Sequence, residues 1–122
     1  MNLNDFIKQN RIGPKPYLFT RHVHCADGFT MSVQASQFTY ASPRDNDGPY
    51  TAVEVGFPSR VEPLLVPFAE EPSNPTGTVY GWTPVELVEK VIRVHGGFAR
   101  FPNLASMPKR LRKYARLNNH RT

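Results

Sequence analysis

Residues 78–97 have the sequence TVYGWTPVELVEKVIRVHGG, in which a short strand runs directly into the clearest helix signal of the chain. We expect Thr83 to be the N-cap and Pro84 to be the first helical residue, because the backbone donor that proline lacks is not needed at that position. Glu86 stands three residues after Thr83, which is the spacing of a capping box. The predicted helix covers about residues 84–95.

Apolar residues recur along this helix at helical spacing and predict the side that packs against the rest of the protein. The stripe consists of Val85, Val88, Val91, Ile92 and His95, and it is widened by Leu87 and Val94. Gly96 and Gly97 follow at once, and glycine readily adopts the left-handed conformation that ends a helix. One well-capped helix is therefore expected to cover a sheet.

The sheet is predicted from a change of period between Tyr17 and Ser36, where polar and apolar residues alternate on either side of Ala26-Asp27-Gly28. A two-residue loop would place polar side chains opposite apolar ones. A three-residue loop with a left-handed Gly28 instead makes one consistent apolar face and is therefore favoured. It pairs Cys25 with Phe29, Val23 with Met31 and Phe19 with Ala35.

The other face of this predicted hairpin is polar, and it is either solvated or a binding site. Its members are Thr20, His22, His24, Thr30, Ser32, Gln34 and Ser36. Both interpretations remain open at this point, because an antiparallel sheet commonly presents one face to water.

The remaining segments predict an α+β fold: a small antiparallel sheet of four to five strands packed by one helix. Asn4-Asp5 is expected to cap a short N-terminal helix within an arm of residues 1–16. Further predicted elements are a sheet extension at Phe38–Ala41, an exposed loop at 42–49 and a strand at Tyr50–Phe57. A proline-rich crossing follows at 58–77 and is expected to pack its apolar side chains on the sheet: Val61, Leu64, Leu65, Val66 and Phe68. The α+β domain would span residues 17–97.

Charge is distributed unevenly between this body and the last residues of the chain. All ten acidic residues precede Gly96, whereas residues 97–122 hold seven Lys and Arg residues and no acidic one. We name residues 98–122 the basic tail and expect a short helix at 108–117 within it. Its candidate contacts to phosphate are Lys109, Arg110, Arg112, Lys113 and Arg116. A solubilising extension and a site for an acidic protein are equally open interpretations.

Composition limits the remaining classes of protein. The chain has 122 residues, of which 39% are hydrophobic, enough for one modest core. A lone cysteine, Cys25, and the lack of a long apolar run predict a cytoplasmic protein with neither membrane span nor secretion signal.

The sequence predicts no catalytic motif, no metal site and no cofactor. His22 and His24 point the same way from a strand, but two ligands do not make a zinc site. Residues 45–48 resemble the start of a calcium loop, yet Gly56 stands where the bidentate glutamate belongs. Cys25 follows His24 directly, so the two side chains point to opposite faces and predict no catalytic pair.

Several blocks of the sequence, taken in order, form a recognisable set. They are residues 26–36, Tyr40, Pro43-Arg44, Gly48-Pro49-Tyr50, residues 53–59, Val79-Tyr80-Gly81, Pro84-Val85-Glu86 and His95-Gly96-Gly97. As a set, over about residues 24–97, they resemble a family of small uncharacterised proteins from bacteriophages and prophages. The resemblance implies a phage accessory protein and supplies no mechanism.

The resemblance makes the recurring polar positions candidates for a recognition surface: Ser32, Gln34, Ser36, Tyr40, Arg44, Tyr50 and Glu54. His22 and His24 join them as members of the polar hairpin face. The alternative, that these side chains fix turns and sheet edges, is at least as open for Ser36 and Tyr50. We expect a phage-encoded, non-enzymatic accessory protein that binds a host or defence protein. The first alternative is a phage nucleic-acid-binding protein that acts through the basic tail. The second is a small enzyme or a sponge for a nucleotide signal, which requires a concave pocket lined by these side chains. An exposed sheet edge is also compatible with a homo-oligomer.

Overall fold

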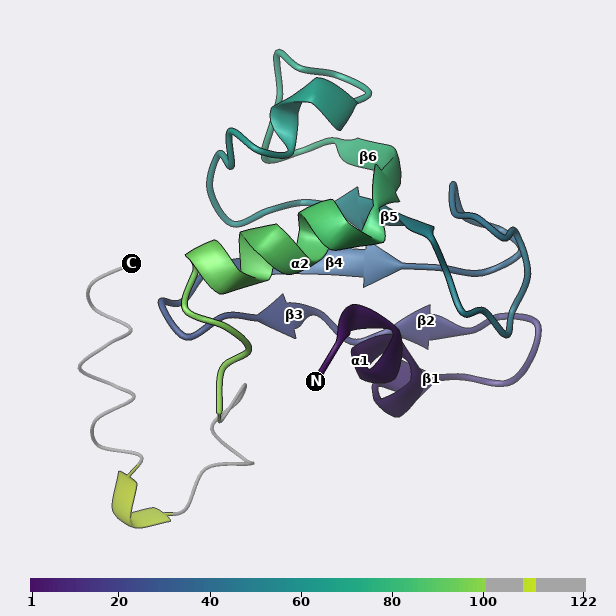
Figure 1. Ribbon diagram of the computed structural model, residues 1–122, viewed down its shortest axis with the longest axis horizontal. Helices are drawn as coiled ribbons and strands as arrows, with labels where there is room; N and C mark the ends of the chain where they lie inside the picture. Colours follow the sequence, from purple (N-terminus) through teal and green to yellow (C-terminus); the bar gives the residue numbers. More distant parts are fainter. Residues whose placement is uncertain (101–108, 112–122) are drawn as a thin grey trace.

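A computed structural model describes residues 1–100 and 109–111 of the chain and shows the predicted α+β class (Figure 1). A four-stranded antiparallel sheet has the order β3-β4-β5-β6, and a separate two-stranded sheet pairs β1 with β2. The elements are α1 (Leu3–Gln9), β1 (Arg11–Ile12), β2 (Phe19–Thr20), β3 (Val23–His24), β4 (Thr30–Gln34), β5 (Ala52–Gly56), η1 (Val66–Phe68), β6 (Val79–Pro84), α2 (Val85–Val94) and η3 (Lys109–Leu111).

The β3–β4 hairpin has the predicted three-residue loop. Val23 pairs with Met31, and the amide of Cys25 donates to the carbonyl of Phe29 at 2.8 Å. Gly28 adopts a φ of 94°, the left-handed conformation that this loop requires. Because side chains alternate along a strand, this register turns Val23, Met31 and Val33 into the core together.

The predicted continuation of the hairpin from Phe19 to Ala35 is wrong. Phe19 pairs with Ile12 of β1, and its side chain is exposed. The side chain of Gln34 takes the place of the missing strand partner: it accepts from the amide of Thr20 and donates to the Thr20 carbonyl, both at 2.8 Å. A side-chain clamp of this kind leaves no trace in strand periodicity.

Helix α2 covers Val85–Val94, one residue less at each end than the predicted 84–95, and it lacks the predicted N-cap. Thr83 is fully buried within β6, and its hydroxyl donates to the carbonyl of Tyr80 at 3.0 Å, so it makes no capping box with Glu86. The predicted helix end is confirmed: the amide of Gly97 donates to the carbonyl of Ile92 at 2.8 Å, and both glycines are left-handed. Val94 points to solvent and does not widen the apolar stripe.

Helix α1 begins earlier than predicted, with Asn2 as the N-cap. Asn4 is not available for capping, because its side-chain amide donates to the carbonyl of Tyr50 and accepts from the amide of the same residue. Leu3 is fully buried in the common core, and its amide donates to Glu89 of α2 at 2.9 Å. The helix is thereby attached to both the sheet and α2.

The segment from Phe38 to Ala41 is a turn rather than the predicted extension of the sheet. Thr39 folds back on Ser36 through backbone and hydroxyl bonds, and only Ser42 pairs with Ala52. The prediction for the 58–77 crossing holds in its main point, because Leu65 is fully buried and Leu64 and Phe68 pack against the core, but Val61 is exposed.

Both helices lie on one side of the sheets (Figure 1), and the apolar side chains of β4 and β5 point toward them. On the other side, Thr30, Ser32, Gln34 and Glu54 are only partly buried. The sheet therefore has one face covered by helices and one face that is polar and open.

Within residues 1–100 and 109–111, no helix is long and apolar enough to cross a membrane.

Candidate functional site

Several predicted recognition residues are engaged in internal contacts. Gln34 clamps Thr20 and also donates to the hydroxyl of Ser32 at 3.0 Å. Ser36 is buried, and its hydroxyl accepts from the amide of Phe38. These side chains fix turns and strand edges, so they contribute little free hydrogen-bonding capacity to a surface.

Tyr50 and Arg44 stabilise the 42–49 loop. Tyr50 is buried; its hydroxyl donates to the carbonyl of Asp45 at 2.9 Å and accepts from Arg11 at 2.8 Å. The guanidinium of Arg11 also donates to the carbonyls of Ala35 and Asn46. Arg44 is exposed and donates to the carbonyl of Gln37 at 3.1 Å. Tyr50 therefore acts as an anchor of the loop rather than as a contact surface.

The two histidines of the hairpin lie at or beside β3, the edge strand opposite β6. Burial lowers the pKa of His24, and the neighbouring His22 lowers it further. No group of three or more potential metal-ligating side chains is present among the described residues.

Of the five candidate contacts to phosphate in the basic tail, the structure describes Lys109 and Arg110, which are exposed in η3. Arg112, Lys113 and Arg116, and most of the helix predicted at 108–117, lie outside the described residues.

Tyr40 and Trp82 form an exposed aromatic pair on the edge of the open face. Val53 pairs with Thr83 and Val55 with Tyr80, so β6 holds one extra residue at this point, a β-bulge. Trp82 lies in the bulge with a φ of 47°, and its amide donates to the carbonyl of Tyr40 at 2.9 Å. The two rings stack with centroids 4.8 Å apart.

Gly81 permits this approach of the two segments. A Cβ atom at Gly81 would lie 3.2 Å from the Cβ of Tyr40, closer than ordinary contact. Glu54 adds a second attachment, because its carboxylate accepts from the amide of Tyr40 at 3.1 Å. The aromatic pair is therefore held by main-chain and side-chain bonds rather than lying loose on the surface.

A groove of about 320 Å³ opens beside this pair; it is lined by Tyr40, Phe68, Glu70, Gly81 and Trp82, and we name it the aromatic groove. Tyr40 is 38% exposed and Trp82 is 52% exposed. Of the predicted recognition residues, the groove includes Tyr40, with Glu54 bonded to its amide, but not Arg44, Gln34 or the histidines. Sequence reasoning assigned Trp82 to the end of a strand; the glycine inside that strand was the available signal of a bulge.

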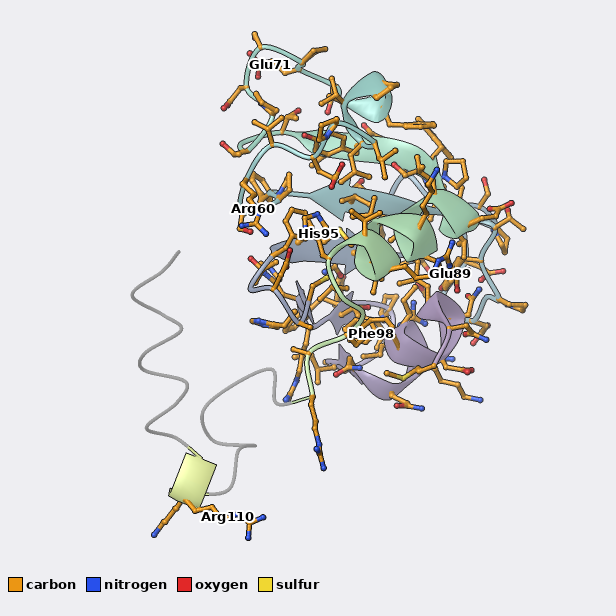
Figure 2. The ribbon with its side chains drawn as sticks, turned by 60° about the vertical axis from the view of Figure 1, so that its left-hand side comes forward. Arg60, Glu71, Glu89, His95, Phe98 and Arg110 are labelled. Carbon is orange, nitrogen blue, oxygen red and sulfur yellow. The ribbon has the colours of Figure 1, made fainter. Side chains whose placement is uncertain are left out.

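A cluster of charged side chains lies at the end of α2, where Figure 2 labels His95 and Arg60. It consists of Asp27, Arg60, Glu62 and His95, and we name it the closed cluster. His95 is hydrogen-bonded through Nδ1 to Asp27 at 2.6 Å and through Nε2 to Glu62 at 2.7 Å. Arg60 donates to the same carboxylate of Asp27 at 2.8 Å. The ring of Phe29 stacks on His95 with centroids 4.1 Å apart.

The closed cluster is better suited to holding segments together than to proton transfer. Both ring nitrogens of His95 are occupied by carboxylates, which leaves none free to accept a proton from a substrate. Burial raises the pKa of Asp27, but hydrogen bonds from the amide of Phe29 and from His95, with the nearby charges of His95 and Arg60, outweigh burial and hold that pKa below its ordinary value. The cluster joins the hairpin loop, the crossing and α2.

A larger cavity of about 520 Å³ lies between α1 and the 42–49 loop. Part of its charged lining is bonded within the molecule: Lys15 pairs with Asp47 at 3.0 Å, and the guanidinium of Arg11 donates to the loop, although its buried Nε has no partner among the described residues. The aromatic groove is the stronger candidate for a site, because its rings are partly exposed and its carboxylate belongs to none of the ion pairs of the described residues.

Comparison with known proteins supplies no relative for this arrangement. The chain matches no family model, no curated protein and no solved structure. The class that fold and site define is therefore a small α+β domain with an open sheet face and an aromatic groove at its edge.

Proposed function

We propose that this chain is a non-enzymatic binding protein that captures a partner protein on its aromatic groove. The observation that carries the proposal is the conformation of Trp82, a large aromatic residue with a φ of 47° whose ring is half exposed. The left-handed conformation costs a residue with a Cβ about 1 to 2 kcal/mol, whereas glycine adopts it readily. Strain of this kind accumulates at functional sites, and exposed tryptophan is enriched among residues that dominate protein interfaces.

The sequence resemblance supports a context for this binding. A phage-encoded accessory protein in the host cytoplasm acts most simply by occupying a host or defence protein, and such occupation needs a recognition surface rather than a catalytic centre. The aromatic groove provides rigid rings of the kind that serve as interface anchors. The closed cluster, by contrast, offers no free base.

The test is capture from a host lysate, followed by purification of the recovered protein and measurement of its affinity for three full-length forms. These are the natural protein, Trp82→Asn and the matched control Tyr17→Ala. Asparagine tolerates the left-handed conformation, so the first variant removes the ring without straining the backbone. Tyr17 is an exposed aromatic residue that stacks on Phe38, and it does not line the groove.

We expect Trp82→Asn to weaken binding of the purified partner at least about tenfold, the loss typical of a central interface residue, and Tyr17→Ala to change it less than about twofold. Equal affinity of the natural protein and Trp82→Asn would overturn the proposal.

One observation favours the nucleic-acid alternative: Lys109 and Arg110 are exposed, and no acidic residue accompanies the seven basic ones after Gly96. Binding through the basic tail would fall steeply with salt, would disappear after nuclease treatment, and would be lost when the five candidate contacts to phosphate are replaced together by glutamine. It would be indifferent to Trp82→Asn.

A further inference from the structure

The walls of the aromatic groove combine three aromatic rings with one carboxylate. Trp82 and Tyr40 stack on each other, Phe68 lies on the adjoining η1 helix, and Glu70 is the only charged residue among the described residues that line the groove. The faces of aromatic rings carry partial negative charge, and indole attracts cations most strongly. The rings and the carboxylate therefore both favour a cationic ligand group.

Glu70 is held in place by its main chain. Its amide donates to the carbonyl of Val79 at 2.9 Å, and the preceding Ala69 forms a bridge with Tyr80. The amide of the following Glu71 donates to the hydroxyl of Thr78 at 3.0 Å. The carboxylate thus extends from a backbone that is fixed to β6, the strand that carries Trp82.

The negative charge at the groove has no counterpart within the described residues. The ion pairs found there use Asp27, Asp47 and Glu62, and none includes Glu70 or the nearby Glu54. A carboxylate without a cationic partner beside aromatic faces produces a local negative potential. This potential would repel a phosphate, which argues against a nucleotide in the groove.

The size of the groove indicates how much of a ligand enters it. About 320 Å³ is at the lower end of the range for ligand pockets and suits one long side chain rather than a whole cofactor. Lysine and arginine combine the required length with a cationic end, and their apolar stems pack well along aromatic rings.

Resting on the proposed function, we propose that the aromatic groove receives a lysine or arginine side chain of the partner protein, with the cation over Trp82 and paired with Glu70. The ring contributes a cation–π contact, the carboxylate contributes a charge-assisted hydrogen bond, and Phe68 contacts the stem. A basic segment of the partner would bind here, and an acidic one would be repelled.

Trp82 is the only tryptophan of the chain, so intrinsic fluorescence reports directly on the groove. The experiment titrates the full-length protein with short peptides in which arginine or lysine alternates with glycine, and with a matched peptide that carries glutamine instead. We expect a saturable change in Trp82 emission with both basic peptides and none with the glutamine peptide. Added salt should weaken the response, because the interacting charges lie near the surface.

Two substitutions locate the binding. Glu70→Gln should lower the affinity for the basic peptides by about two- to fivefold, the size expected for a surface charge pair. The matched control is Glu86→Gln, an exposed glutamate on α2, and it should leave the affinity unchanged. An identical response to the glutamine peptide, or equal affinities for Glu70→Gln and the natural protein, would overturn the assignment of a cation.

These measurements distinguish a wrong assignment of the cation from a wrong proposed function. If the purified partner depends on Trp82 but is insensitive to Glu70→Gln and to salt, the groove binds the partner through an apolar group and only the cationic assignment is wrong. If the partner is insensitive to Trp82→Asn as well, the groove is not the interface and both proposals are wrong.

Discussion

The closed cluster and the aromatic groove contain similar chemical groups but differ in how far these groups are buried and paired. Each brings rings and carboxylates together from segments that are distant in the sequence. In the closed cluster, His95 is bonded to two carboxylates, and Glu62 is only 5% exposed. In the groove, the ring of Trp82 is half exposed, and Glu70 forms no ion pair within the described residues.

Under the proposed function, the same chemistry serves stability in the closed cluster and binding in the aromatic groove. A buried carboxylate with donors on both sides holds segments in place, and removal of a donor leaves an uncompensated charge. An exposed carboxylate beside bare rings contributes little to folding and retains its capacity for a ligand. Substitutions in the two regions should therefore separate into those that unfold the protein and those that only abolish binding.

The largest loss of stability is expected from His95→Ala. This change removes a hydrogen-bond partner from both Glu62 and Asp27, together with the ring stacked on Phe29, so the free energy of unfolding should fall by about 2 to 4 kcal/mol. Urea denaturation monitored by circular dichroism measures it. Val94→Ala, at the neighbouring exposed position, should change the same quantity by less than about 0.5 kcal/mol. Equal effects of the two substitutions would show that the closed cluster is not a stabilising feature.

The thiol of Cys25 should report the integrity of the closed cluster. Burial, followed by the charge of Asp27, raises the pKa of Cys25 from 9.0 to about 11, which lowers the thiolate fraction at pH 8 about a hundredfold. We expect slow reaction with a thiol reagent in the folded protein and faster reaction in His95→Ala, since loss of the cluster opens the hairpin loop. Rapid reaction of the natural protein under native conditions would contradict the burial of Cys25.

Acid should weaken the closed cluster through Asp27. Because its folded pKa lies below its unfolded value, the folded state binds fewer protons between the two values and stability rises with pH across that window. The contribution of Asp27 is thus complete above about pH 4 and is lost as the pH falls through the folded pKa. Urea midpoints of the natural protein and Asp27→Asn, measured from pH 7 downward, should differ at neutral pH and converge in acid. A constant difference would contradict this role.

Only a small change in stability is expected from Trp82→Asn. Relief of the left-handed strain offsets the lost contact with Tyr40, so the free energy of unfolding should stay within about 1 kcal/mol of the natural value while binding is lost. Phe57→Asn is the matched case, because Phe57 is exposed with a φ of 49° and does not line the groove. Calorimetric melting of both variants measures the effect. A loss above about 3 kcal/mol in Trp82→Asn would assign Trp82 a structural role.

Local patterns predicted the parts of the fold that depend on neighbours in the sequence. The register of Val23 with Met31 follows from alternation together with a glycine in the loop, and the end of α2 follows from Gly96 and Gly97. Both are determined by backbone sterics and by the periodicity of apolar side chains. The existence of α2 and its end could be predicted for the same reason.

Predictions failed where a side chain formed a hydrogen bond other than the capping bond that its position in the sequence indicates. Threonine is a common N-cap residue, but the hydroxyl of Thr83 donates to the carbonyl of Tyr80 within β6. Asn4 likewise bonds the backbone of Tyr50 rather than capping α1. A hydrogen-bonding side chain has several partners of similar energy, and only the folded chain determines which of them is within reach.

The sequence by itself therefore determined the α+β class, the hairpin loop, the course and end of α2, and the separation of an acidic body from a basic tail. Only the tertiary structure decided which polar residues became internal clamps and which rings became a surface. Tyr40 and Trp82 are distant in the sequence, and their contact depends on a bulge in β6 and on the absence of a side chain at Gly81. Periodicity describes which way a side chain points, whereas a binding groove depends on where separate segments meet in space.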